Sequence, residues 1–309
     1  MTISPDFLAG PRLAVIAALF SFSVGPVGVV VQKWLVASFS PFLIVAVQMT
    51  GGAVVLWAIR YFAFPKASVS RASMLKGFGL GVLHPGSFMI VYTAASGWLD
   101  SVTAVLLLAL VPALVAIGGR LVLKEALRPV VLVGIAVSLA GLVVLVSERD
   151  VTGSNEPLGF LLGILGLVLA SGSVIAGRAL NTGAVLPWFV LAPLQVTGAA
   201  CVAWLGVLAT GTSIHVSSIA ENAGAFLYLV LGMTAASYFA YNFALSLLPT
   251  PALGLLSAAG PGVGALAAAI IFATSIGTVA LLGIAVILFG AALPSLTAVI
   301  ARRKAEPNS

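Results

Sequence analysis

Hydrophobic residues occur in long uninterrupted runs, separated by short polar or charged segments. Ten such runs approach or exceed the ~20 residues with which a helix crosses a hydrocarbon core about 30 Å thick. The runs are Leu13–Val31, Pro41–Ile59, Gly77–Leu99, Ser101–Gly119, Pro129–Ser147, Leu158–Gly177, Leu186–Thr210, Asn222–Leu248, Pro251–Thr274 and Ser275–Ile300. This pattern predicts an all-α integral membrane protein with ten transmembrane helices. The boundary between the last two helices is the least defined, because only Thr274, Ser275 and Gly277 indicate a turn.

Residues of the first half recur in the second half at a nearly constant displacement. At a displacement of 147 residues, Gln48, Thr50, Gly51 and Trp57 match Gln195, Thr197, Gly198 and Trp204. At a displacement of 149 residues, Tyr92, Pro112, Gly134 and Gly141 match Tyr241, Pro261, Gly283 and Gly290. With five spans per half, the second copy must begin on the opposite face of the bilayer. We therefore predict two inverted five-helix repeats, residues 1–150 and 151–309, which is an arrangement typical of secondary transporters.

Composition supports the membrane assignment and excludes most enzyme chemistry. Of the 309 residues, 61% are hydrophobic and 7% are charged, compared with roughly 25% charged residues in a soluble domain. Two histidines, His84 and His215, and one cysteine, Cys201, supply neither a paired nucleophile and base nor a metal cluster. We expect no enzyme activity, no cofactor and no metal.

The basic residues predict how the chain is oriented. Of 14 Lys and Arg residues, 12 fall on the side of the N-terminus, and only Lys33 and Arg149 fall opposite. By the positive-inside rule both termini are cytoplasmic, in the inner (cytoplasmic) membrane of a cell. The net charge of +6 therefore reflects membrane orientation and not binding of nucleic acid.

Small residues and prolines occupy matched positions in the two halves. Gly134 and Gly141, seven residues apart on one helical face, favour close packing of the fifth helix, and their counterparts do so in the tenth. Pro112 and Pro261 fall near the centres of the fourth and ninth helices. Each proline either fixes a kink that helps packing or acts as a hinge.

The end of the first half carries a recognisable pattern. Arg120, Lys124 and Glu125 are followed by Pro129 and by the two glycines of the fifth helix. With the evenly divided repeat, this pattern resembles the EamA type of the drug/metabolite transporter superfamily. The resemblance implies ten spans and export or exchange of metabolites, and the chain is most similar to bacterial exporters of amino acids, including aromatic ones. Thr274 stands where the family commonly has a second glutamate, so a role that needs both acids is not implied.

Polar groups at mid-depth are the candidates for substrate binding, because they are costly against lipid. Gln48 and Gln195 lie near the centres of the second and seventh helices, where they either bind a zwitterionic solute or bond to neighbouring helices. His84 lies within the third helix and is the only mid-membrane side chain whose ordinary pKa, about 6.5, is near neutral pH. It is either a structural donor or the site of proton coupling.

The eighth helix is the most polar. Its Ser237, Tyr238, Tyr241 and Asn242 recur at helical spacing and predict one face that borders a cavity. Tyr92 and Tyr241 lie toward opposite ends of their helices, as paired gates would, although packed tyrosines with satisfied hydroxyls fit equally well.

The predicted function is export of small neutral or zwitterionic metabolites by alternating access, with amino acids that carry aromatic or large apolar side chains as the favoured solutes. Lys33 and Arg178 lie near helix ends, so strongly anionic solutes fit poorly. Export of amphiphilic drugs or other metabolites, and a channel-like uniporter, remain alternatives. The expected partners are the solute and the lipid bilayer. A monomer fits the sequence, which does not fix the oligomeric state.

Orientation can be tested by cysteine labelling in a variant that lacks Cys201. A cysteine at Ser70 should be shielded from an impermeant thiol reagent in intact cells, and a cysteine at Ser154 should react, because the basic loops are expected inside. The reverse pattern would contradict cytoplasmic termini and the direction of export.

Overall fold

The computed structural model describes residues 11–64, 69–122, 129–147, 155–180, 186–248, 256, 260–273 and 277–305. The elements of these residues are all helical. They are α1 (Pro11–Leu35), α2 (Pro41–Ala63), α3 (Arg71–Gly81), η2 (Val82–Ser87), α4 (Phe88–Trp98), α5 (Ser101–Leu107), η3 (Leu108–Leu110), α6 (Val111–Val122), α7 (Pro129–Ser147), α8 (Pro157–Leu180), α9 (Trp188–Ala209), α10 (Val216–Glu221), α11 (Ala223–Leu227), η4 (Tyr228–Ala236), α12 (Ser237–Leu247), α14 (Gly260–Ile271) and α15 (Thr278–Ala305).

The described part of each predicted apolar run lies mainly on one helix or on consecutive helical segments. Among the described residues, five helical stretches are long and apolar enough to cross a membrane, beginning at Arg12, Pro41, Arg71, Trp188 and Ala223. The all-helical membrane fold is therefore confirmed, while ten spans in two inverted repeats stay a prediction. α14 ends at Ile271 and α15 begins at Thr278, on either side of the expected turn, of which Thr274 and Ser275 lie outside the described residues.

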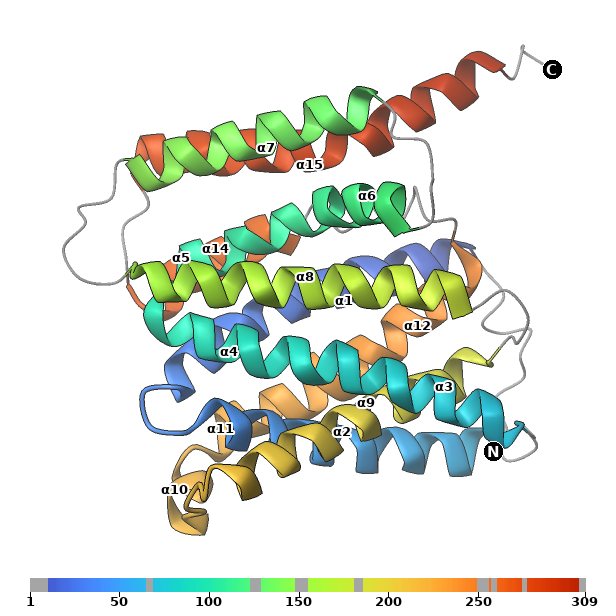
Figure 1. The fold of residues 1–309 in the computed structure, drawn as a ribbon, viewed down its shortest axis with the longest axis vertical. Coiled ribbons are helices and arrows are strands. Elements are labelled where there is room, and N and C mark those ends of the chain that lie inside the picture. The colour runs from blue at the N-terminus through green and yellow to red at the C-terminus, as the bar shows by residue number, and fades with distance from the viewer. Residues whose placement is uncertain are drawn as a thin grey trace.

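The long helices lie side by side in a stack (Figure 1). α7 and α15 pack together at one end of the stack, and α2 packs against α9 at the other. Between these pairs, α1 contacts α12, α14 and η4, and α4 contacts α8.

Local hydrogen bonds mark where helices begin. Ser40 caps α2 by accepting from Leu43 N at 3.3 Å, and Pro41 follows at the first helical position. Asp100 caps α5 by accepting from Thr103 N at 3.0 Å and also accepts from Asn155 Nδ2 at 2.6 Å. A carboxylate in a connecting loop is thus held by two segments of the chain.

The glycines of α7 and α15 contact each other reciprocally. The sequence predicts close packing at these glycines but does not name the partner helix. A Cβ atom at Gly141 would lie 2.9 Å from Gly283 O, and one at Gly290 would lie 2.6 Å from Gly134 O. At the repeat displacement of 149, Gly141 corresponds to Gly290 and Gly134 corresponds to Gly283. Each contact is therefore the repeat-related copy of the other. The close approach of the two backbones is therefore confirmed.

A second reciprocal pair joins α2 to α9. Trp57 Nε1 donates to Thr197 Oγ1 at 2.9 Å, and Trp204 Nε1 donates to Thr50 Oγ1 at 2.8 Å. These four residues are two pairs displaced by 147 positions. The two indoles tie the helices together, which the sequence alone did not indicate.

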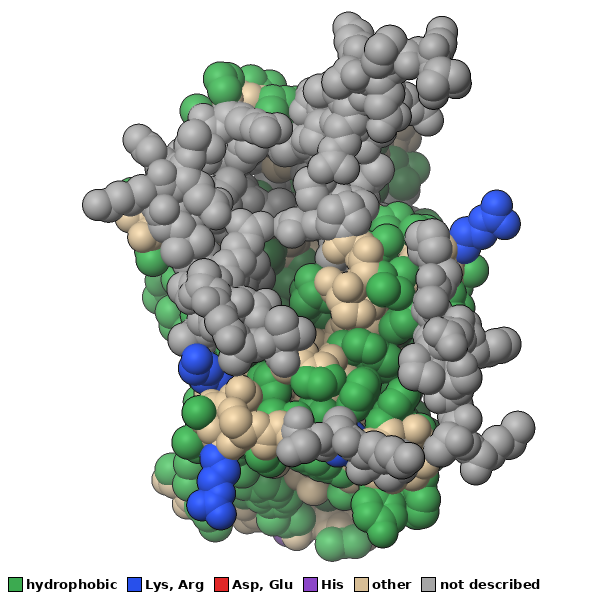
Figure 2. Space-filling view, turned by 90° about the vertical axis from the view of Figure 1, so that its right-hand side faces the viewer, with side chains coloured by type: hydrophobic (Ala, Val, Ile, Leu, Met, Phe, Trp, Pro, Cys, Tyr) green, Lys and Arg blue, Asp and Glu red, His purple; other side chains and the backbone are tan. Residues whose placement is uncertain are grey.

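The described surface is mostly apolar (Figure 2), and few Lys or Arg side chains interrupt it on the face shown. Large hydrophobic side chains such as Tyr61, Leu208 and Ile270 are at least 72% exposed. Contiguous apolar surface of this kind suits lipid chains and not water.

Two helices lose regular α geometry at related positions. Within η2, His84 has extended backbone angles, φ −146° and ψ 121°, so the helix is broken there. Residues 231–236, displaced by 149 from η2, lie in η4, which is a π-helix. Pro112 is the second residue of α6, which begins directly after the 3₁₀ turn η3, and Pro261 is the second residue of α14 as described. Their hinge role stays a prediction.

Matched glycine substitutions test the packing of α7 on α15. Gly141→Ala should lower the free energy of unfolding by roughly 1–3 kcal/mol, because the new methyl group would meet backbone atoms. Gly172→Ala, in the middle of α8 with open space beside it, should be neutral or stabilise by up to about 1 kcal/mol. Denaturant unfolding in detergent measures both. Equal effects would contradict close packing at Gly141.

Candidate functional site

The break in the third predicted helix places His84 inside the bundle. Pro85 has no N–H to donate and disfavours helical angles at the residue before it, so η2 interrupts the run. Ser87 Oγ donates to Val82 O at 2.9 Å, which satisfies a carbonyl beside the break. The imidazole of His84 stacks on the ring of Phe88 with centroids 4.9 Å apart, and the centroid of Tyr238 lies 6.5 Å away.

Gln195 and Asn242 lie beside this break. Gly81, the last residue of α3, packs against the backbone of Gln195, and Gly198 of α9 packs against Phe78 O. Asn242 Nδ2 lies 2.9 Å from Tyr238 O and 3.4 Å from Gln195 Oε1 and donates to both. His84, Gln195, Tyr238 and Asn242 are called the His84 cluster below.

Gln48 belongs to a separate network. Its side chain is 0% exposed. Its Oε1 accepts from Gln32 Nε2 at 2.8 Å, and its Nε2 donates to Thr234 Oγ1 at 2.9 Å and contacts Met233 Sδ at 3.4 Å. The amide of Gln48 therefore links α1, α2 and η4. In the structure this glutamine forms hydrogen bonds with neighbouring helices, which is one of the two alternatives that the sequence leaves open.

Ser237 and the two paired tyrosines have protein partners as well. The hydroxyl of Ser237 bonds to that of Ser21 at 2.8 Å, which joins α12 to α1. Tyr92 is buried and donates its hydroxyl to Ala104 O, whereas Tyr241 packs edge-on against Phe22 with centroids 6.0 Å apart. The predicted face of the eighth helix thus points into the bundle, and only Tyr238 and Asn242 of this face join the His84 cluster.

Several predicted residues cannot be placed. The side chains of Pro112 and Pro261 are not described, and Glu125 and Thr274 lie outside the described residues. Sequence reasoning missed Gln32, because it directly precedes Lys33 and reads as part of the charged end of a helix.

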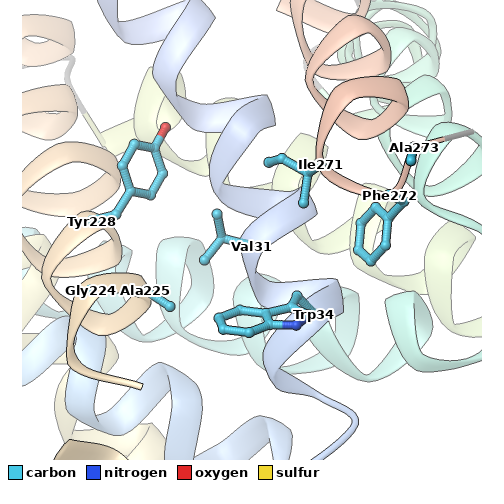
Figure 3. A pocket seen from close by; sticks show the side chains of 8 residues that line it. All are labelled: Val31, Trp34, Gly224, Ala225, Tyr228, Ile271, Phe272 and Ala273. Carbon is cyan, nitrogen blue, oxygen red and sulfur yellow. The ribbon is translucent and has the colours of Figure 1, made fainter. Parts of the chain in front are cut away.

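A cavity of about 760 Å³ is lined by none of the residues of the His84 cluster or of the Gln48 network (Figure 3). Trp34, Tyr228 and Phe272 converge on it from α1, η4 and the end of α14. Its remaining lining is Val31, Gly224, Ala225, Ile271 and Ala273. The hydroxyl of Tyr228 donates to Val24 O at 3.0 Å, so it already has a protein partner. The rest of the described lining is almost entirely apolar.

The chemistry of the described site is uncharged. The His84 cluster offers amide, imidazole and phenol groups. Within the described residues, no group of three or more His, Cys, Asp or Glu side chains could hold a metal ion. Such a site can bind a polar solute by hydrogen bonds but has no described carboxylate with which to bind a cation.

Fold and site together define a multi-pass membrane protein that carries hydrogen-bonding groups inside an apolar bundle. Residues 12–147 match the EamA-like transporter family. This match confirms, for residues 12–147, the resemblance drawn from the sequence. The family consists of membrane transporters of small molecules and is not an enzyme family.

One solved structure, titled "Crystal structure of protein", is similar to 98% of this chain over 100% of its own length. The TM-score is 0.67 and the sequence identity is 20%, so the likeness supports the fold alone. No curated protein matches the chain.

Removal of Gln32 tests the network around Gln48. Gln32→Leu should cost roughly 1–3 kcal/mol of unfolding free energy, because Gln48 Oε1 would remain buried without a donor. Gln195→Leu, the same change at a half-buried glutamine with one hydrogen bond, should cost less. Unfolding of both variants in one detergent gives the comparison. An equal or larger loss for Gln195→Leu would contradict the network.

Proposed function

We propose that the protein is a secondary transporter that exports small neutral or zwitterionic metabolites from the cytoplasm by alternating access. The favoured solutes are amino acids with aromatic or large apolar side chains. The observation that carries this proposal is the His84 cluster, in which uncharged hydrogen-bonding groups lie beside a helix break inside an apolar bundle. Broken helices with free backbone groups are typical of transporter binding sites.

Charge argues against anionic solutes. Sugar phosphates and nucleotides need basic groups that face the binding site. Lys33 donates to Gly97 O at 3.2 Å near the end of α1, away from the His84 cluster. The described part of the cluster contains amides, a phenol and an imidazole, which suit a carboxylate and ammonium pair better than a phosphate.

The reciprocal contacts support two inverted five-helix repeats, residues 1–150 and 151–309. The hydrogen bond of Trp57 has a repeat-related copy in that of Trp204, and the contact of Gly141 has one in that of Gly290. An inverted repeat gives two equivalent arrangements that face opposite sides of a membrane, which is the basis of alternating access.

The moving parts in this proposal are the segments that depart from regular helix at related positions. η2 and η4 replace α-helix in the two halves. Pro112 and Pro261 act as hinges in this proposal, and Tyr92 and Tyr241 act as gates, because each pair occupies equivalent positions in the two repeats. The orientation with cytoplasmic termini in the inner membrane rests on the basic loops.

One observation favours a second solute class. The cavity lined by Trp34, Tyr228 and Phe272 is apolar and aromatic, and its volume of about 760 Å³ lies within the range of about 300–1,000 Å³ that is common for small-molecule sites. An amphiphilic drug or other apolar metabolite would fit such a cavity, so these solutes are the alternative cargo.

Transport by purified protein in liposomes tests the proposal. We expect saturable movement of labelled L-phenylalanine or L-leucine and little movement of glucose 6-phosphate, because the described site lacks a cation for phosphate. Overproducing cells should tolerate toxic analogues of these amino acids, and empty liposomes and vector-only cells are the controls. Movement of phosphorylated or anionic solutes alone would contradict the proposed substrate class.

A further inference from the structure

The two repeat-related glutamines have different surroundings. Gln48 is fully buried, and its amide oxygen and nitrogen both have protein partners. Gln195 is half-buried, and within the described residues its only hydrogen bond is the one that its Oε1 accepts from Asn242. We propose that, of these two glutamines, only Gln195 binds the solute, that its Nε2 donates to the solute carboxylate, and that Asn242 is the positioning residue that orients it. This assignment rests on the proposed function.

A backbone carbonyl fixes the direction of this hydrogen-bond chain. Tyr238 O can only accept, so the group of Asn242 that lies 2.9 Å from it must be the amide nitrogen. The same nitrogen lies 3.4 Å from the end of the Gln195 side chain, which must therefore present oxygen there. The Nε2 group of Gln195 is consequently turned away from Asn242.

Within the described part of the chain, no group accepts a hydrogen bond from Gln195 Nε2. Gly81 and Gly198 bring α3 against the backbone of α9 at this point, which holds Gln195 near the helix break at His84. An N–H donor without an acceptor suits a carboxylate oxygen, which only accepts when ionised. The polarity of the site thus selects the carboxylate end of a zwitterion.

Asn242 carries a second sign of a role beyond packing. It is 2% exposed, and its Oδ1 has no hydrogen-bond partner among the residues that the structure describes. Buried polar atoms without partners are costly, and each calls for an explanation. If only the fold mattered, an apolar residue would avoid this cost. The presence of an amide at position 242 is explained if the amide nitrogen is needed to orient Gln195.

Gln48 is assigned the opposite role. Gln32 and Thr234 occupy its oxygen and its nitrogen, and Met233 lies against the same nitrogen. A solute would have to break bonds between α1, α2 and η4 to reach it. The repeat therefore supplies two glutamines, of which one braces helices and one is left to bind.

The test is the transport kinetics of labelled L-phenylalanine in liposomes containing the full-length protein. Gln195→Ala should raise KM roughly tenfold or more with a smaller change in kcat, because a hydrogen bond to a charged group is lost. Gln48→Ala should leave KM within about twofold and lower thermal stability instead. Thr234→Val, which removes one partner of Gln48 and keeps the side-chain shape, gives the same comparison should Gln48→Ala not fold.

A double-mutant cycle tests the positioning role. Asn242→Ala should raise KM in the wild-type background and have little further effect in the Gln195→Ala background, because it acts through Gln195. Additive effects would contradict the positioning role, and equal KM changes for the two glutamines would contradict their division of roles. Wild-type protein that moves no L-phenylalanine would contradict the proposed function itself, and with it this assignment.

Discussion

A polar side chain inside a lipid-embedded bundle can bond only to protein, to water in a cavity or to a solute, because the surrounding hydrocarbon offers no partner. This constraint organises the interior. Gln48, Gln32 and Thr234 satisfy one another and join three helical segments. Gln195 and Asn242 are satisfied only in part, beside the broken helix at His84. The incompletely satisfied groups are those left to bind a solute, and the satisfied groups hold the helices that surround them.

Close approach of backbones places these groups. Gly81 and Gly198 let α3 and α9 meet at Gln195, much as Gly141 and Gly290 let α7 and α15 meet at the end of the stack. Glycines, which have no side chain, therefore have two structural roles here. At the end of the stack they fasten two long helices together, and in the interior they bring a break in one helix against a polar residue of another.

The sequence predicted the helices and their glycine contacts well, since hydrophobic runs of helix length and glycines seven residues apart are local patterns. It did not predict which polar residues meet. Gln48 and Gln195 occupy equivalent positions in the repeat, yet their roles diverge because Gln32 and Thr234 reach only the first. Similarly, the repeat pairs Trp57 with Trp204, but it does not indicate that their indoles bond to threonines of the opposite half. Contacts between distant helices depend on how the helices are rotated, which periodicity does not fix.

The central claim is that the inverted halves expose one solute site to each side of the membrane in turn. Counterflow measures this most directly. Liposomes loaded with unlabelled L-phenylalanine, placed in a trace of labelled L-phenylalanine, should transiently accumulate label above its equilibrium level, because each site that returns inward carries labelled solute while unlabelled solute leaves. A monotonic approach to equilibrium, without any overshoot, would contradict alternating access and indicate a channel.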